Sequence, residues 1–297
     1  MDVLFQTLVY GFATGGVIAV AAVGLTLSFG VTGFINFGYG ELLTVAAYTT
    51  YVLTEAGLGL LPAAAAGTAI TSAVAVGVAR TCYQPLASRG PLPLLITSIG
   101  VAFVLQNLVR IGFGGEPRGF PAPTWTPWQL GGVFIPKLQT VIFLVAGVCM
   151  LGVHLLLRHT LLGRTMRAAA SNEDLARLSG LDTRRIVLVT WVASSLIAGL
   201  GGVLLGASQG DITPSVGFEF LLLVFAAALL GGIGQPYGAM LGALLIGLGV
   251  EFGAAYVSAN YNYALAFGVI VLVLLARPGG LFGRGGGNAV PSEGGTP

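Results

Sequence analysis

The stretch Phe34-Ile-Asn-Phe-Gly-Tyr-Gly-Glu-Leu-Leu43 separates two long apolar runs. It places a carboxamide, Asn36, and a carboxyl group, Glu41, where a membrane chain would be entering or crossing the bilayer. Such groups are costly in hydrocarbon and normally face a protein interior or a water-filled pathway. Gly38 and Gly40 each weaken a helix by about 1 kcal/mol relative to alanine. A polar, glycine-broken membrane segment is typical of a discontinuous helix that lines a transport route.

The composition indicates a membrane protein. Of 297 residues, 55% are hydrophobic and only 8% are charged, and the mean hydropathy is +0.91. A soluble domain carries about 25% charged residues, so this chain could not cover a water-facing surface. Its apolar runs are roughly 20 residues long, which is the length of a membrane-spanning helix. We therefore expect an all-α integral membrane protein.

Nine apolar segments are candidate membrane helices, which predicts eight to nine transmembrane spans. They lie at about residues 5–29, 34–54, 60–80, 92–112, 138–157, 186–206, 218–234, 237–257 and 261–276. Residues 1–277 would form one transmembrane domain. The Gly-, Ser- and Pro-rich remainder, residues 278–297, cannot bury a core and is expected to be a disordered cytoplasmic tail.

The arginines predict the orientation of the chain. The connection at 158–185 carries six of them, two more flank the connection before the fourth segment, and two follow the last segment. Cytoplasmic loops are enriched in basic residues, so these regions are assigned to the inside. The 113–137 connection, with only Arg118 and Lys137, then lies outside. The chain is expected in the inner (cytoplasmic) membrane, with its N-terminus outside and its C-terminus in the cytoplasm.

The order of the segments fits an inverted repeat, because segments one to four start outside and segments six to nine start inside. Both sets have an acid in or near their second segment, Glu41 in one and Glu219 in the other. Glu219 would meet an external partner or face water. Glu251, near the outer end of the eighth segment, fits an interfacial polar belt better than a substrate contact.

Catalytic and nucleotide-binding signals are missing from the sequence. The only lysine, Lys137, follows a proline, so the chain has no phosphate-binding loop of the G-x-x-x-x-G-K-[ST] type. No nucleophile–base pair or group of metal ligands falls at membrane depth. We expect a chain that is not an enzyme, holds no cofactor or metal and does not hydrolyse ATP by itself.

A short amphipathic helix is predicted inside the cytoplasmic connection. Ser171 followed by Asp174 resembles a capping box, and Gly180 fits a helix stop. Leu175 and Leu178, three residues apart, would share one face. Such a helix at the membrane surface suits docking into the groove of a partner, and the alternative is an ordinary solvated loop with a helical turn.

Four motifs in order resemble one known family. They are Gly33-Phe-Ile-Asn-Phe-Gly-Tyr-Gly-Glu41, Arg167-Ala-Ala-Ala-Ser-Asn172 with Gly180-Leu-Asp-Thr183, Ala228-Leu-Leu-Gly-Gly-Ile-Gly-Gln-Pro-Tyr-Gly-Ala-Met240 and Arg277-Pro-Gly-Gly-Leu-Phe-Gly283. The chain is similar, from about residue 10 to residue 283, to LivH-type permeases of the branched-chain amino acid ABC importers. At Tyr39 members of this family often have a histidine.

The resemblance implies partners for the chain. They are two cytoplasmic ABC ATPase subunits that bind ATP, a second permease subunit of the LivM type, an extracytoplasmic substrate-binding protein and the membrane lipid, but no nucleic acid. It also implies that the 172–180 helix couples the permease to the ATPases. The coupling residues would be Arg167, Asn172, Glu173, Asp174, Leu175, Arg177, Leu178 and Gly180.

Two functions follow, and the first is favoured. The chain would be the pathway subunit of an ABC importer for branched-chain or other hydrophobic amino acids, or else for urea, amides or another small solute. The second is a stand-alone secondary transporter that binds a coupling ion at Asn36 and Glu41. Within the importer, Asn36, Gly38, Tyr39, Gly40 and Glu41 either line the pathway or mark a helix break, where Glu41 would accept hydrogen bonds from freed backbone amides.

Overall fold

The computed structural model describes residues 2–123, 125–130 and 133–256, together with residues 264, 266–268, 271, 275, 280 and 281. The ninth predicted segment and the predicted tail therefore lie almost entirely outside the described residues. Within the described residues the regular secondary structure is helical apart from four very short strands, which confirms the all-α prediction.

The described chain folds into ten α-helices, most of them joined by short connections. They are α1 (Asp2–Thr32), α2 (Gly38–Glu55), α3 (Leu60–Val78), α4 (Pro91–Phe113), α5 (Lys137–His159), α6 (Leu161–Ser171), α7 (Glu173–Leu178), α8 (Thr183–Gln209), α9 (Val216–Gly231) and α10 (Pro236–Tyr256). A π-turn, η1 (Ala79–Tyr83), and a 3-10 helix, η2 (Gln84–Arg89), continue α3. The strands β1 (Arg118–Gly119) and β4 (Asp211–Ile212) pair with each other, as do β2 (Trp128–Leu130) and β3 (Val133–Ile135).

Each of the first eight predicted segments coincides with a helix. Among the described residues, six helical stretches are long and apolar enough to cross a membrane: Leu4–Thr32, Leu60–Arg89, Pro91–Phe113, Lys137–His159, Thr183–Gln209 and Pro236–Tyr256. The other two segments became α2 and α9. The second segment starts at Gly38 rather than at residue 34, because residues 33–37 form a non-helical linker.

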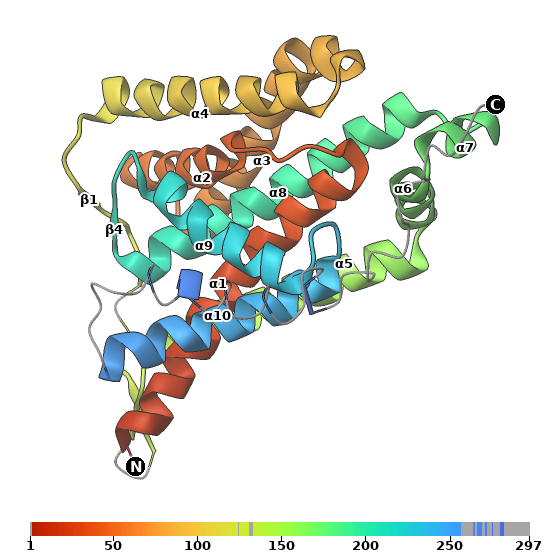
Figure 1. Ribbon diagram of the computed structural model, residues 1–297. Coiled ribbons are helices and arrows are strands. Elements are labelled where there is room, and N and C mark those ends of the chain that lie inside the picture. The colour runs from red at the N-terminus through yellow and green to blue at the C-terminus, as the bar shows by residue number, and fades with distance from the viewer. Residues whose placement is uncertain are drawn as a thin grey trace.

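The core is built around α1, whose middle turns are buried on all sides. Val17 to Ala22 are at most 3% exposed, and they contact residues of α2, α5, α8, α9 and α10 in one apolar cluster. Helices α4 and α5 lie at opposite edges of the molecule (Figure 1). They carry large exposed apolar side chains such as Ile111 and Val148, 83% and 70% exposed. A surface of this kind suits lipid or another membrane subunit.

The packing has the pattern of an inverted repeat. The contacts α1–α10, α2–α3 and α2–α8 have counterparts in α8–α3, α9–α10 and α9–α1, so the pattern is kept when α1, α2 and α3 are exchanged with α8, α9 and α10. The contacts α1–α8 and α2–α9 join helices that are exchanged with each other, so the exchange leaves these two contacts unchanged. Helices α1 and α8 run in opposite directions (Figure 1). The predicted symmetry therefore has a physical counterpart in the packing.

Glycine permits the closest of these contacts. A Cβ added to Gly247 of α10 would collide with the backbone of Gly15 in α1. In lipid, where helices gain little from burying apolar surface, such close backbone approach supplies the van der Waals contact that holds helices together.

The connections predicted on either side of the membrane lie at opposite ends of the molecule. In Figure 1, α6 and α7 lie to the right, with β1, β4 and the start of α1 to the left. The β1–β4 pair joins the 114–136 connection to the α8–α9 connection, with Arg118 opposite Ile212. The 113–137 connection was predicted to lie outside, and the structure places the α8–α9 connection at the same end. We refer below to this end as the outer end and to the end with α6 and α7 as the inner end.

Candidate functional site

The linker between α1 and α2 turns the chain back into the protein. Gly33 ends α1 with φ +70, a backbone conformation that other residues rarely adopt. The amide of Phe37 then donates a hydrogen bond to the Ser98 hydroxyl of α4 (3.1 Å), and that hydroxyl donates to the carbonyl of Leu95 (2.7 Å). Irregular backbone at membrane depth needs such protein partners.

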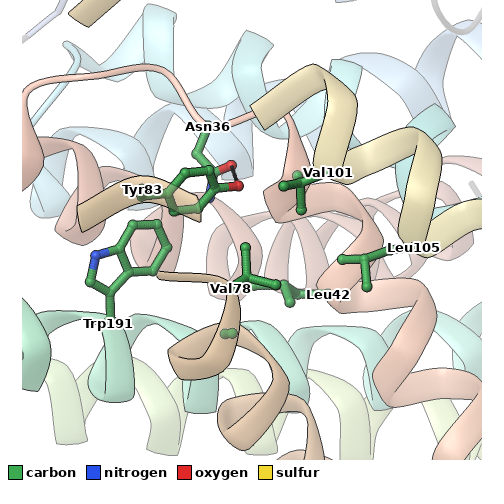
Figure 2. Close-up of a pocket in the computed structure, with 9 residues that line it drawn as sticks. Asn36, Leu42, Val78, Tyr83, Val101, Leu105 and Trp191 are labelled. Carbon is green, nitrogen blue, oxygen red and sulfur yellow. Dashed lines mark hydrogen bonds between the residues drawn. The ribbon is translucent and has the colours of Figure 1, made fainter. Parts of the chain in front are cut away.

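Asn36 is held inside this linker by a side chain from the π-turn. The hydroxyl of Tyr83 donates to Asn36 Oδ1 at 3.1 Å, and Asn36 is only 3% exposed. The Tyr83 ring stacks on Trp191 of α8, with ring centroids 5.2 Å apart. Figure 2 shows these three side chains at one end of a small cavity of about 10 Å³, which has room for at most one water molecule. The contacts Asn36–Tyr83 and Tyr83–Trp191 therefore tie the α1–α2 linker to η1 and η1 to α8 in this conformation.

The first turn of α2 crosses α9 at two glycines. A Cβ on Gly40 would lie 2.7 Å from the carbonyl oxygen of Gly217, and a Cβ on Gly217 would collide with the carbonyl oxygen of Gly40. The amide of Gly217 also donates to the hydroxyl of Thr44 at 3.1 Å. Gly38 has less restriction, since its added Cβ would approach the Tyr83 hydroxyl at 3.0 Å. Tyr39 is fully buried against Gly24 of α1.

Glu41 is buried without a counter-charge. It is 1% exposed, and neither carboxyl oxygen has a hydrogen-bond partner among the described residues. The hydroxyl of Thr44 approaches the carboxyl group without the geometry of a hydrogen bond. The backbone amides that the helix-break interpretation assigned to Glu41 do not reach it in the described residues. A buried carboxyl group without partners is costly, which marks the position as a functional candidate.

The inner end presents a short, exposed helix. In α7 the side chain of Asn172 caps the helix by accepting from the amide of Leu175 at 3.0 Å, and Gly180 follows its end with φ +83. The predicted start at Ser171 was therefore one residue early, because Ser171 is the last residue of α6. Leu175 and Leu178 are 60% and 84% exposed.

The other predicted coupling residues lie close by. Arg167 on α6 and Arg177 on α7 are exposed, and the side chains of Glu173 and Asp174 are outside the described residues. Arg167 also lines an inner cavity of about 600 Å³ between the end of α1, α6 and the α9–α10 connection. Within the described chain, the pathway residues 36–41 and the coupling residues 167–180 form two separate groups.

The sequence interpretation missed one constellation at the outer end. Glu251 is half-buried, its Oε1 accepts a hydrogen bond from Thr14 of α1 at 2.7 Å, and it lines the same cavity as Glu219. The two acids lie on different helices, 32 residues apart in the chain, so only their packing shows that they converge. The sequence feature that could have revealed this pair is the presence of an acid at the outer end of each of two apolar segments.

Known proteins resemble this chain along nearly its whole length. The family model described as "Branched-chain amino acid transport system / permease component" matches residues 7–274. The permease protein BraD of the high-affinity branched-chain amino acid transport system of Pseudomonas aeruginosa is 36% identical over 94% of this chain and 95% of its own. The corresponding permease LivH of Escherichia coli K12 is 34% identical over the same shares of both chains.

The fold also resembles that of a solved structure. A chain of a transporter assigned to the metal-chelate type of ABC transporters, in an inward-facing conformation, matches with a TM-score of 0.50. The match covers 90% of this chain and 85% of that one at 16% identity. At this identity the likeness concerns the arrangement of helices alone.

Proposed function

The chain belongs to the family of branched-chain amino acid transport permeases, and from this premise we propose that it forms the translocation pathway for leucine, isoleucine and valine in an ATP-driven importer. It is a multi-pass membrane protein and the permease subunit of an ABC transporter. Members of such importers work with ATPase subunits and a substrate-binding protein. The inner membrane, with the N-terminus outside, is part of the proposal.

The observation that carries the proposal is α7. A six-residue helix with two leucines exposed at 60% and 84% has little reason to exist in a chain that works alone, because exposing them to water gains nothing. Its buried Ala176, 5% exposed, and its capped start fix the helix against the rest of the chain. We assign α7 as the docking helix for an ATPase subunit, which would bind ATP in place of this chain.

The proposed route passes the first turn of α2. Asn36, Tyr39 and Glu41 are all at most 3% exposed, so this conformation is closed at that level. The unpartnered carboxyl group of Glu41 would meet the ammonium group of a zwitterionic solute when the helices around Gly40 and Gly217 separate. The second permease subunit would be a related LivM-type chain.

Reconstitution tests the proposal directly. The chain is expressed with its genomic neighbours, purified in mild detergent and reconstituted into vesicles with the binding protein. We expect two ATPases and a second permease to co-purify, and leucine uptake to require ATP. Uptake of urea or amides in preference to leucine would replace the substrate assignment. Ion-gradient-driven uptake by this chain alone would overturn the importer assignment.

A further inference from the structure

The outer ends of α1, α5, α8, α9 and α10 enclose a second cavity, of about 290 Å³. It lies at the opposite end of α1 from the inner cavity and from the linker that holds Asn36. Its polar lining consists of two carboxylates, two carboxamides and hydroxyl groups, contributed among others by Thr14, Gln139, Ser208, Gln209, Glu219 and Glu251. The cavity is therefore a space of its own with a distinct chemistry.

Both carboxylates are already oriented. Thr14 donates to Oε1 of Glu251 and Ser215 donates to Oε1 of Glu219, each at 2.7 Å. Each bond holds one oxygen of its carboxylate, and the second oxygen remains for another donor. The half-buried bond at Glu251 preorganises that acceptor, so it binds a ligand without first paying to order a flexible side chain.

A buried acceptor from a third helix, α5, also lacks a hydrogen-bond donor. Oε1 of Gln139 in α5 is inaccessible to solvent and has no hydrogen-bond partner among the described residues. Buried polar atoms normally find a partner. Gln139 lines the cavity, so a rotation of its carboxamide toward the cavity would bring this oxygen to a donor there.

The charge of the cavity is one-sided. None of its described lining residues is a lysine, arginine or histidine. The basic residue nearest in sequence to the lining is Lys137, two residues before Gln139. Its Nζ lies over the ring of Trp128, 5.9 Å from the ring centroid. The rest of the lining is apolar and includes Val17, Ile142 and Phe220. Such a site suits a small molecule that has a positively charged group with several hydrogen-bond donors and is otherwise apolar.

We propose that this outer cavity binds the ammonium group of a small aliphatic solute, with Glu219 and Glu251 as charge partners and Gln139 as an added acceptor. The proposal rests on the proposed function, because there the solute is the amino acid released by the binding protein. The ammonium group would be held at the outer end before the route past α2 opens. An apolar side chain would contact Val17, Ile142 and Phe220.

The test uses the assembled importer in lipid nanodiscs without the binding protein, and isothermal titration calorimetry with isoamylammonium as the probe. This amine has the side chain and ammonium group of leucine without its carboxylate. We expect it to bind, and isovalerate, which lacks the ammonium group, not to bind. Glu219→Gln and Glu251→Gln should each weaken amine binding about tenfold or more, the effect of losing one charge-assisted hydrogen bond.

Matched controls separate the site from general charge effects. Glu55→Gln removes an exposed carboxylate from the outer end of α2, away from the cavity, and should leave amine binding unchanged. If Glu251→Gln fails to fold, Glu219→Gln still decides, since Glu219 is exposed. Equal binding to wild type and Glu219→Gln overturns the proposal, and so does displacement of the amine by sodium at equal concentration.

The outcomes also separate this site from the proposed function. An importer that takes up leucine with ATP but binds no amine would refute the site alone. An importer that binds the amine through Glu219 and Glu251, yet takes up no amino acid, would keep the site and refute the substrate assignment.

Discussion

Gly40 and Gly217 exclude a side chain from each other: a Cβ on either residue would run into the carbonyl oxygen of the other. The two glycines belong to the two helices that the inverted repeat relates, α2 and α9, and they lie in the first turn of each. Glu41 is the residue that follows Gly40, so it lies next to this crossing in the chain. Close packing at this point thus fixes the start of α2, where the predicted pathway residues lie.

We expect Gly217→Ala to destabilise the folded permease by about 1–3 kcal/mol, the usual cost of forcing extra volume into a packed core. The matched control is Gly77→Ala, because nothing lies within 4 Å of the added Cβ at that helical position. The measurement is the midpoint of thermal unfolding in detergent, followed by fluorescence-detected size exclusion. An unchanged midpoint for Gly217→Ala would mean that α2 and α9 can separate at little cost.

Glu41→Gln is expected to leave assembly and thermal stability at least equal to wild type, because a buried carboxyl group without partners loses nothing when it becomes neutral. Uptake should slow about tenfold or more if the carboxylate meets the ammonium group in transit. Capture of leucine by the binding protein serves as the control and should not change. Normal uptake would show that the charge has no role in the pathway.

The hydrogen bond from Tyr83 to Asn36 is the third testable feature. Tyr83→Phe leaves Asn36 Oδ1 buried and unpaired, which should cost about 1–3 kcal/mol of stability. Tyr256→Phe is the control, since Tyr256 is 62% exposed. Equal unfolding midpoints for the two variants would show that the linker does not depend on this bond.

Leu178→Asp and Leu175→Asp should uncouple transport from ATP hydrolysis without unfolding the membrane domain. A charge on the docking face must lose its hydration against the ATPase, which costs several kcal/mol. Leu178→Met, which keeps an apolar side chain of similar volume, should transport normally. Normal ATP-driven uptake by both aspartate variants would show that α7 is not the docking surface.

The orientation is tested by labelling intact cells. In a background without Cys82 and Cys149, a cysteine at position 118 should react with a membrane-impermeant reagent and a cysteine at position 174 should not. The reverse pattern would invert the whole topology.

Hydropathy predicted the helices well, because every backbone group in a bilayer must be satisfied within its own segment and only long apolar helices do so. It could not place the linker at residues 33–37. There the deciding partners, Ser98 and Tyr83, are 47 or more residues away in the chain. The importance of Asn36 and Glu41 was visible because both are polar within apolar sequence, but their partners, or the lack of them, depend on tertiary packing.

The outer cavity shows the same limit more sharply. Glu219, Glu251 and Gln139 come from three helices, and each alone resembles an ordinary polar residue near a membrane surface. No spacing in the sequence relates them. Their convergence follows from the way α9 and α10 pack around α1, which is a property of the whole bundle.

The bond from the amide of Gly217 to Thr44 spans 173 residues of chain, which has a consequence for biogenesis. During synthesis α2 leaves the ribosome long before α9 exists. In addition, α2 is not one of the six described helices that are long and apolar enough to cross a membrane. Until α9 arrives, the first turn of α2, which contains Gly40 and Glu41, lacks the helix that it crosses, so the nascent α2 is a natural substrate for insertion factors that shield polar segments. We expect a cysteine at position 41 to react with a small thiol reagent in nascent chains that end before Val216, and to be protected in the complete chain.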